Sequence, residues 1–125
     1  MPFHVDHVQL PVAIGGLREA RRFYQELLGL PELRSPALDR PGTLHFALGA
    51  QRLDLAEGHY LGVAPNAHLA LQADDLRPIH HRLRAARVPV EKTALSDEAE
   101  RLHVEDPFGN RIEIIAPRQI GRAHV

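Results

Sequence analysis

The stretch RLHVEDPFGNRIEII, residues 101–115, decides the fold. Apolar and polar residues alternate on both sides of its centre, as they do in strands, and the DPFG between them supplies the Pro and Gly of a tight turn. We therefore predict a hairpin with strands Arg101–Glu105 and Arg111–Ala116. Each strand places one polar side chain between two aliphatic ones: His103 in the first and Glu113 in the second.

The same pattern occurs earlier in the chain. His45 and Asp54 also stand between apolar neighbours, 58 and 59 residues before their counterparts in the hairpin. His7, in the first alternating stretch, precedes His68 in a similar stretch by 61 residues. A nearly constant offset of this kind indicates an internal repeat. We interpret the chain as two copies of one βαβββ unit.

Local patterns fill in both copies. Alternation predicts strands and a 3.6-residue period predicts helices. In the first copy we expect strands at 5–12, near Leu33, at 43–48 and at 51–56, and a helix over 17–28 that ends at Gly29. In the second we expect strands at 68–73 and 90–94, followed by the hairpin, and a helix that starts after Asp75 and ends before Val88. The fold class is α+β, in one domain of residues 1–117 with modules at 4–57 and 67–117 and a joint at 58–66.

Composition excludes several classes of protein. The 125 residues carry 15 basic and 16 acidic side chains, so there is no basic excess for nucleic acid or anionic membranes. There is no cysteine, hence no disulfide or thiolate metal site. We find no signal peptide or membrane span and expect a cytoplasmic protein. Residues 118–125 show no period, and we hypothesise that this tail is an assembly artefact outside the fold.

Strand parity predicts which polar groups converge. Neighbours on a strand face opposite ways, so if the aliphatic residues pack under the helices, Asp54 and Glu113 face the other side together with His7 and His68. Imidazole and carboxylate ligands suit Fe, Mn, Co, Ni or Zn as divalent ions. The alternative is that each histidine is a half-buried polar group with a hydrogen-bond partner, and the residues alone leave both interpretations open.

These residues also carry a resemblance. The sequence around His7, the helix motif Arg22–Leu30, the strand with His68 and the segment Asp106–Glu113 resemble the vicinal oxygen chelate superfamily, which includes glyoxalase I, extradiol dioxygenases and bleomycin-binding proteins. The resemblance implies two βαβββ modules that form an eight-stranded, barrel-like cup. It also implies one divalent metal ion on His7, His68 and Glu113, with Asp54 at the position of a fourth ligand.

The function that the resemblance implies depends on whether Asp54 binds the metal ion. With Asp54 bound, the chain is expected to be a metal-dependent lyase or isomerase of glyoxalase type, which forms an enediolate from a substrate with vicinal oxygens. Glu113 and Asp54 are then the catalytic residues. Asp is one methylene shorter than the usual Glu or Gln; without it, two histidines and a carboxylate suit an extradiol-type dioxygenase. A third alternative is a binding protein that sequesters a drug or other ligand.

The remaining expectations concern substrate and assembly. We predict that His45, His103 and Gln9 contact a small-molecule substrate, and that the chain forms a homodimer. The sequence leaves open whether one chain closes the cup or two chains share it. His80 and His81, by helix periodicity, belong to the outer surface of the second helix.

Overall fold

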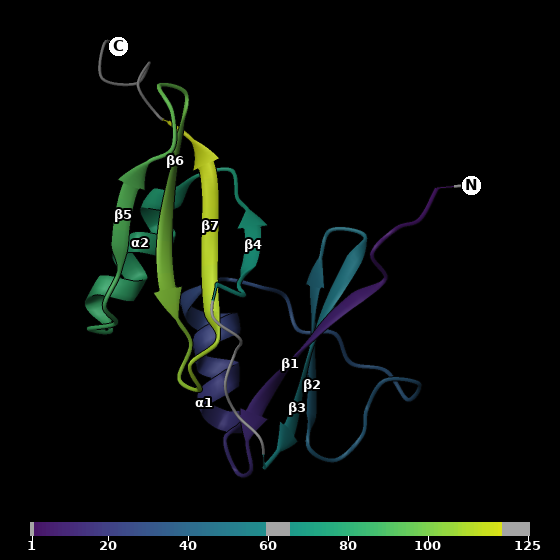
Figure 1. Cartoon of the computed structure of the whole chain (residues 1–125). Coiled ribbons are helices and arrows are strands. Elements are labelled where there is room, and N and C mark those ends of the chain that lie inside the picture. Colours follow the sequence, from purple (N-terminus) through teal and green to yellow (C-terminus); the bar gives the residue numbers. More distant parts are fainter. Residues whose placement is uncertain (1, 60–65, 119–125) are drawn as a thin grey trace. The chain divides into compact units, whose positions relative to one another are not determined.

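The computed structural model describes residues 2–59 and 66–118. The chain divides into two compact units (Figure 1). The first holds the described residues up to 59 together with 107–110, and the second holds 66–106 and 111–118. Each unit is described by itself, and the sheet and helix of the first and second units are called the first and second module.

The first module is a sheet with a helix on one face. Its strands are β1 (His7–Ala13), β2 (Thr43–Leu48) and β3 (Gln51–Gly58), in the order β1-β3-β2. β1 pairs with β3 in parallel, and β2 pairs with β3 in antiparallel orientation. A single bridge from Glu32 to Phe46 continues the sheet beyond β2. This bridge is the remnant of the weak strand predicted near Leu33.

The first helix changes its winding halfway. It starts as α1 (Leu17–Arg21) and continues as the π-helical segment η1 (Arg22–Leu27). The wider turn is visible in the bond from Leu28 N to the Phe23 carbonyl oxygen, 3.0 Å over five residues. Phe23 and Tyr24, both buried, pack edge to face with ring centroids 5.0 Å apart. Gly29 follows with φ of 87°, the left-handed conformation expected of a helix stop.

The second module is a four-stranded sheet covered by one helix (Figure 1). Its strands, in the spatial order β4-β7-β6-β5, are β4 (Leu69–Gln72), β5 (Glu91–Ala94), β6 (Ala99–Glu105) and β7 (Arg111–Pro117). The helix α2 (Leu76–Ala85) begins at Asp75, whose side chain accepts a hydrogen bond from the Arg77 backbone. Buried Leu76, Ile79 and Leu83 of α2 cover the aliphatic side of the sheet.

The turn between β6 and β7 belongs to the first unit. Asn110 Nδ2 donates a 3.0 Å hydrogen bond to the carbonyl oxygen of Pro11, in β1. The Phe108 ring lies so close to Gly16 that a Cβ there would be 2.6 Å from a ring carbon. Gly16 is therefore needed because of packing, since its φ of -95° is open to any residue.

The α+β fold with two βαβββ modules is confirmed. The predicted strand at 43–48 is found with the same bounds, and the ends of the other helices and sheet strands differ from the prediction by at most two residues. The joint at 58–66 and the tail at 118–125 lie largely outside the described residues, and the division at 4–57 and 67–117 stays a prediction. None of the helices in the described part of the chain has the length and apolar character of a membrane span.

Candidate functional site

Each sheet has one apolar and one polar face. In the first module Leu53 and Leu55 are fully buried beneath the helix, while Asp54 between them points to the opposite face. The register places Gln9 and His45 directly beside Asp54, on β1 and β2. Side chains of paired residues share a face, so all three belong to the polar face. The parity argument thus holds in this module.

The second module repeats this arrangement. Glu113, between buried Ile112 and Ile114, stands opposite His103 of β6 and Ala70 of β4. His68 lies two residues before Ala70, and its Nε2 is 3.2 Å from Glu113 Oε1. Each module therefore centres its polar face on one carboxylate, with one histidine from its first strand and another from the neighbouring antiparallel strand.

Asp54 is held on both of its oxygens. Oδ1 accepts from Arg52 Nε at 2.7 Å and from His45 Nδ1 at 2.6 Å, and Oδ2 accepts from Arg52 Nη2 at 3.0 Å. His7 Nε2 is further away, 3.9 Å from Oδ2. Asp54 is only 5% exposed. This bidentate pair is the strong geometry for an arginine and a carboxylate.

The electrostatics of Asp54 follow from these contacts. Burial raises the pKa of Asp54, but the hydrogen bonds from Arg52 and His45 outweigh burial and hold the pKa below its usual value. Asp54 is therefore an anion whose lone pairs are largely engaged. Such a group is a poor proton acceptor and has little left to offer a metal ion.

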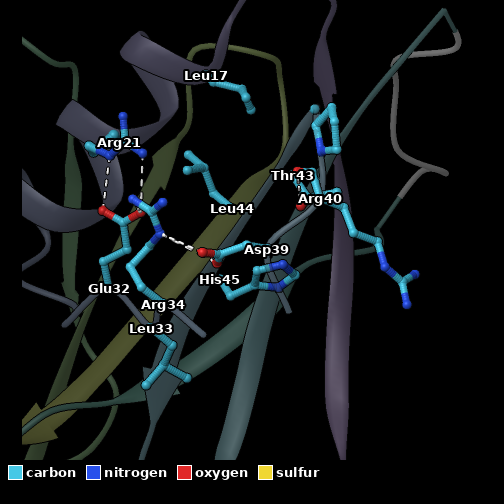
Figure 2. Close-up of a pocket in the computed structure, with 12 residues that line it drawn as sticks. Leu17, Arg21, Glu32, Leu33, Arg34, Asp39, Arg40, Thr43, Leu44 and His45 are labelled. Carbon is cyan, nitrogen blue, oxygen red and sulfur yellow. Dashed lines mark hydrogen bonds and ion pairs between the residues drawn. The ribbon is translucent and has the colours of Figure 1, made fainter. Parts of the chain in front are cut away.

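His45 connects Asp54 to a loop. Its Nε2 lies 3.0 Å from the Leu38 carbonyl oxygen, so both ring nitrogens have a partner. The same histidine lines a pocket of about 390 Å³. Figure 2 shows two ion pairs in this pocket, between Arg21 and Glu32 and between Arg34 and Asp39. Its main charges are thus paired within the protein.

Glu113 is held more loosely than Asp54. Its Oε2 accepts from Arg101 Nη1 at 3.3 Å and lies 3.5 Å from His103 Nε2. Its Oε1 faces His68. Glu113 is 7% exposed, whereas the His68 side chain is 46% exposed. A buried carboxylate beside an exposed imidazole can supply two ligands to a metal ion that enters from solvent.

The distance between His68 and Glu113 fits this use. Two ligand atoms about 2.1 Å from one ion, at right angles to each other, are about 3.0 Å apart. The 3.2 Å between His68 Nε2 and Glu113 Oε1 is close to that value. Among the residues that the structure describes, no three metal-type ligands come together, so His68 and Glu113 are a facing pair and not a complete metal site.

The other predicted residues have distinct surroundings. His7 Nδ1 bonds to Asp6 Oδ2 at 2.8 Å, which leaves the other ring nitrogen toward Asp54. Gln9 is exposed on the polar face. His68 and His103 line a pocket of about 860 Å³ in the second module, together with Glu91. These placements keep His7, Gln9 and His103 as candidates for metal or substrate contact.

Sequence reasoning missed the two arginines. Arg52 and Arg101 are not among the residues predicted for the site. Yet Arg52 lies two residues before Asp54, and Arg101 two residues before His103. Strand parity, applied to the histidines and carboxylates, places both arginines on the same polar faces. Strand parity at positions 52 and 101 therefore indicates that both arginines lie beside the predicted ligands.

Known proteins were compared with the chain. A family model described as "Glyoxalase/Bleomycin resistance protein/Dioxygenase superfamily" matches residues 4–114. Among solved structures, a glyoxalase family protein from Bacillus anthracis is 29% identical, with a TM-score of 0.81 over 94% of this chain and 98% of that one. No curated protein matches.

Two further solved structures are similar at lower identity. The lactoylglutathione lyase from Agrobacterium tumefaciens is 23% identical, with a TM-score of 0.69 over 92% of this chain and 94% of that one. A fosfomycin resistance protein from Listeria monocytogenes is 20% identical, with a TM-score of 0.74 over 98% of each chain. At these identities the likeness concerns the fold.

Proposed function

The chain belongs to the glyoxalase, bleomycin resistance protein and dioxygenase superfamily, and from that premise we propose that it is a metal-dependent enzyme of glyoxalase type. Its substrate is a small molecule with two vicinal oxygens. The observation that carries this proposal is the pair His68 and Glu113, whose facing atoms are spaced like neighbouring ligands of one ion.

We assign the metal to His7, His68 and Glu113. His7 has one ring nitrogen engaged by Asp6, and a neutral imidazole fixed in this way is the usual form of a histidine ligand. Asp54 belongs to the set only if it leaves Arg52 and His45. We therefore propose three ligands, with Asp54 as a neighbouring charged group, in place of the four-ligand arrangement.

The proposed reaction begins with removal of a proton next to a carbonyl group. When bound, the ion supplies an electrophile that polarises the vicinal oxygens of the substrate. We assign proton removal to Glu113, because its oxygens have the longer contacts, 3.2–3.5 Å, while Asp54 is engaged at 2.6–3.0 Å. Burial of Glu113 keeps bulk water away from the proton it takes up.

Metal analysis tests the ligand assignment. Protein purified without chelators is expected to contain a divalent ion of the Zn, Ni, Co, Mn or Fe group, and His68→Ala is expected to lose it. His81→Ala is the matched control, because His81 is exposed on α2. Equal metal content in wild type and His68→Ala would remove the proposed site. A wild type that takes up none of these ions would favour the binding-protein alternative.

Hydrogen exchange tests the chemistry. We expect the metal-loaded enzyme to exchange the α-hydrogen of α-hydroxy carbonyl compounds for deuterium in D2O. NMR measures the rate of this exchange. Glu113→Gln removes the proton acceptor but keeps the side-chain shape, and is expected to lower the exchange rate at least a hundredfold. An unchanged rate at equal metal occupancy would contradict the role of Glu113.

A second candidate follows from the engagement of Asp54. The proposed set, with Asp54 held by Arg52, is two histidines and one carboxylate, and this combination is also typical of non-haem Fe(II) oxygenases. The extradiol-type dioxygenase then becomes the alternative. Oxygen uptake with catechols by anaerobically iron-loaded protein would favour it over the isomerase or lyase.

Assembly and location complete the proposal. We propose a cytoplasmic homodimer in which Gln9, His45 and His103 border the substrate. Mixing His7→Ala with His68→Ala chains tests whether two chains share a site. A shared site regains half an ion per chain in the mixed dimer, because one of its two sites is then wild type. A site closed within one chain regains nothing.

A further inference from the structure

A continuous row of polar contacts crosses the whole second sheet. It runs from His68, next to β4, to Glu113 in β7, then to Arg101 in β6 and Thr93 in β5. The distances are 3.2 Å from His68 Nε2 to Glu113 Oε1, 3.3 Å from Arg101 Nη1 to Glu113 Oε2 and 3.2 Å from Arg101 Nε to Thr93 Oγ1. Each of the four strands, or the residue beside it, supplies one member.

Arg101 contacts one of the two oxygens of Glu113, and His68 faces the other. The guanidinium occupies Oε2, while Oε1 points at His68. The second Arg101 contact, to Thr93 Oγ1, fixes the rotation of the guanidinium plane, since two of its nitrogens are then tied to different strands. A buried carboxylate held in this way presents one oxygen in one direction.

We propose that Arg101 is the positioning residue of the metal centre: it fixes Glu113 so that Oε1 alone is offered to the ion, beside His68. This inference rests on the proposed metal site. Thr93 contributes by holding Arg101. In the first module Arg52 donates two hydrogen bonds to the equivalent carboxylate, Asp54. We attribute the different roles of Asp54 and Glu113 to this difference in hydrogen bonding.

Two effects of Arg101 on metal affinity oppose each other. Its positive charge, near the site, repels a cation, so its removal by charge alone would tighten binding. Its hydrogen bond orients a ligand, and loss of such a partner typically weakens metal affinity 10- to 100-fold. A positioning role therefore predicts weaker binding in a variant that, on charge alone, would bind more tightly.

The test measures Co²⁺ and Zn²⁺ dissociation constants by titration calorimetry, together with the visible spectrum of the Co²⁺ form. Arg101→Gln is expected to weaken binding about 10- to 100-fold and to change the Co²⁺ spectrum. Arg101→Lys keeps the charge but loses the fork, and is also expected to weaken binding. Arg118→Gln removes a charge that contacts the Ser96 carbonyl oxygen, and is expected to leave affinity within about twofold.

The outcomes separate this inference from the proposed function. If wild type binds metal, His68→Ala does not, and Arg101→Gln binds equally or more tightly, Arg101 is no positioning residue while the metal site stands. If wild type binds no metal, both fall. Thr93→Val guards against a folding artefact, because it leaves Arg101 and Glu113 in place. It should keep the melting temperature while shifting the Co²⁺ spectrum in the same sense as Arg101→Gln, and an unchanged spectrum would count against the proposed row.

Discussion

Asp54 and Glu113 show how equivalent residues acquire different chemistry from their neighbours. Both are buried at the centre of a polar sheet face, and both have two histidines and an arginine nearby. The arginine of the first module lies on the same strand as its carboxylate and binds both oxygens. The arginine of the second reaches one oxygen from the adjacent strand. Asp54 is thereby held by contacts of 2.6–3.0 Å, and Glu113 by longer ones of 3.2–3.5 Å.

Replacing Asp54 by Asn tests how much its contacts stabilise the first module. The variant leaves Arg52 and His45 without their anion in a buried site, and should lower the free energy of unfolding by about 2 kcal/mol. Urea unfolding of metal-free protein in EDTA measures this. Asp39→Asn is the control, since its ion pair with Arg34 is largely exposed and should matter by less than about 0.5 kcal/mol.

The same pair predicts a pH dependence. Because the pKa of Asp54 is lowered in the folded protein, its stabilisation is present above the ordinary Asp pKa of about 3.9 and is lost as pH falls through the folded value. The difference in unfolding free energy between wild type and Asp54→Asn should therefore shrink between pH 5 and pH 2. A difference that stays constant over this range would show that shape, and not charge, causes the loss.

At the residue scale, the sequence predicted the polar faces but not the contacts on them. Alternation around Asp54 and Glu113 was enough to place both residues opposite the apolar core. The alternation contained no information about which carboxylate oxygen an arginine contacts. That contact depends on how far side chains extend along a strand and between neighbouring strands. For this reason the role of Asp54 stayed open until Arg52 was located beside it.

At the scale of elements, the β6–β7 turn shows which structural features a local sequence pattern predicts and which it does not. Its Phe108 ring packs on Gly16, at the start of the first helix, and its Asn110 bonds to β1. The motif DPFG predicted a turn, and a turn is found. That the turn belongs to the first compact unit was not predicted. Turn propensity depends on neighbouring residues, whereas this packing joins residues far apart in the sequence.

Gly16→Ala tests this packing. The added methyl would lie 2.6 Å from Phe108 Cε1 and 3.0 Å from the Ala13 carbonyl oxygen. We expect a loss of about 1–3 kcal/mol in unfolding free energy, because the ring must move. Gly58→Ala is the control, since a Cβ there has nothing within 4 Å. Partial recovery in the double variant Gly16→Ala/Phe108→Leu would identify the ring as the cause, and no recovery would point to the backbone contact.

The first helix shows the limit of periodicity. The spacing of Leu17, Phe23 and Leu27 predicted one regular helix, and the ends agree with the structure. The structure instead has a π-helical turn, which contains the buried rings of Phe23 and Tyr24, and the Tyr24 ring also lies 5.9 Å from that of Phe46. A widened turn of this kind shifts the register by one residue, which sequence spacing barely records.

At the scale of the whole molecule, the two modules differ in the contacts of their equivalent residues, and this difference supports the proposal of a single metal site. Each module presents one carboxylate and one first-strand histidine, which on symmetry alone would permit two equivalent half-sites. The contacts break this symmetry, because Arg52 and His45 bond to Asp54 at 2.6–3.0 Å, while Glu113 Oε1 has the longer 3.2 Å contact with His68 Nε2. We therefore expect the second module to supply two ligands and the first to supply His7.

This division predicts one ion per chain, whether the modules combine within a chain or between two. Calorimetric titration with Zn²⁺ should give a stoichiometry of one, and His7→Ala and His68→Ala should each abolish the tight phase. Asp54→Asn should retain it with affinity changed by less than about tenfold, because the ligands named here remain. Two ions per wild-type chain would mean that each module binds its own. Loss of the ion in Asp54→Asn, at intact fold, would return Asp54 to the ligand set and with it the four-ligand site.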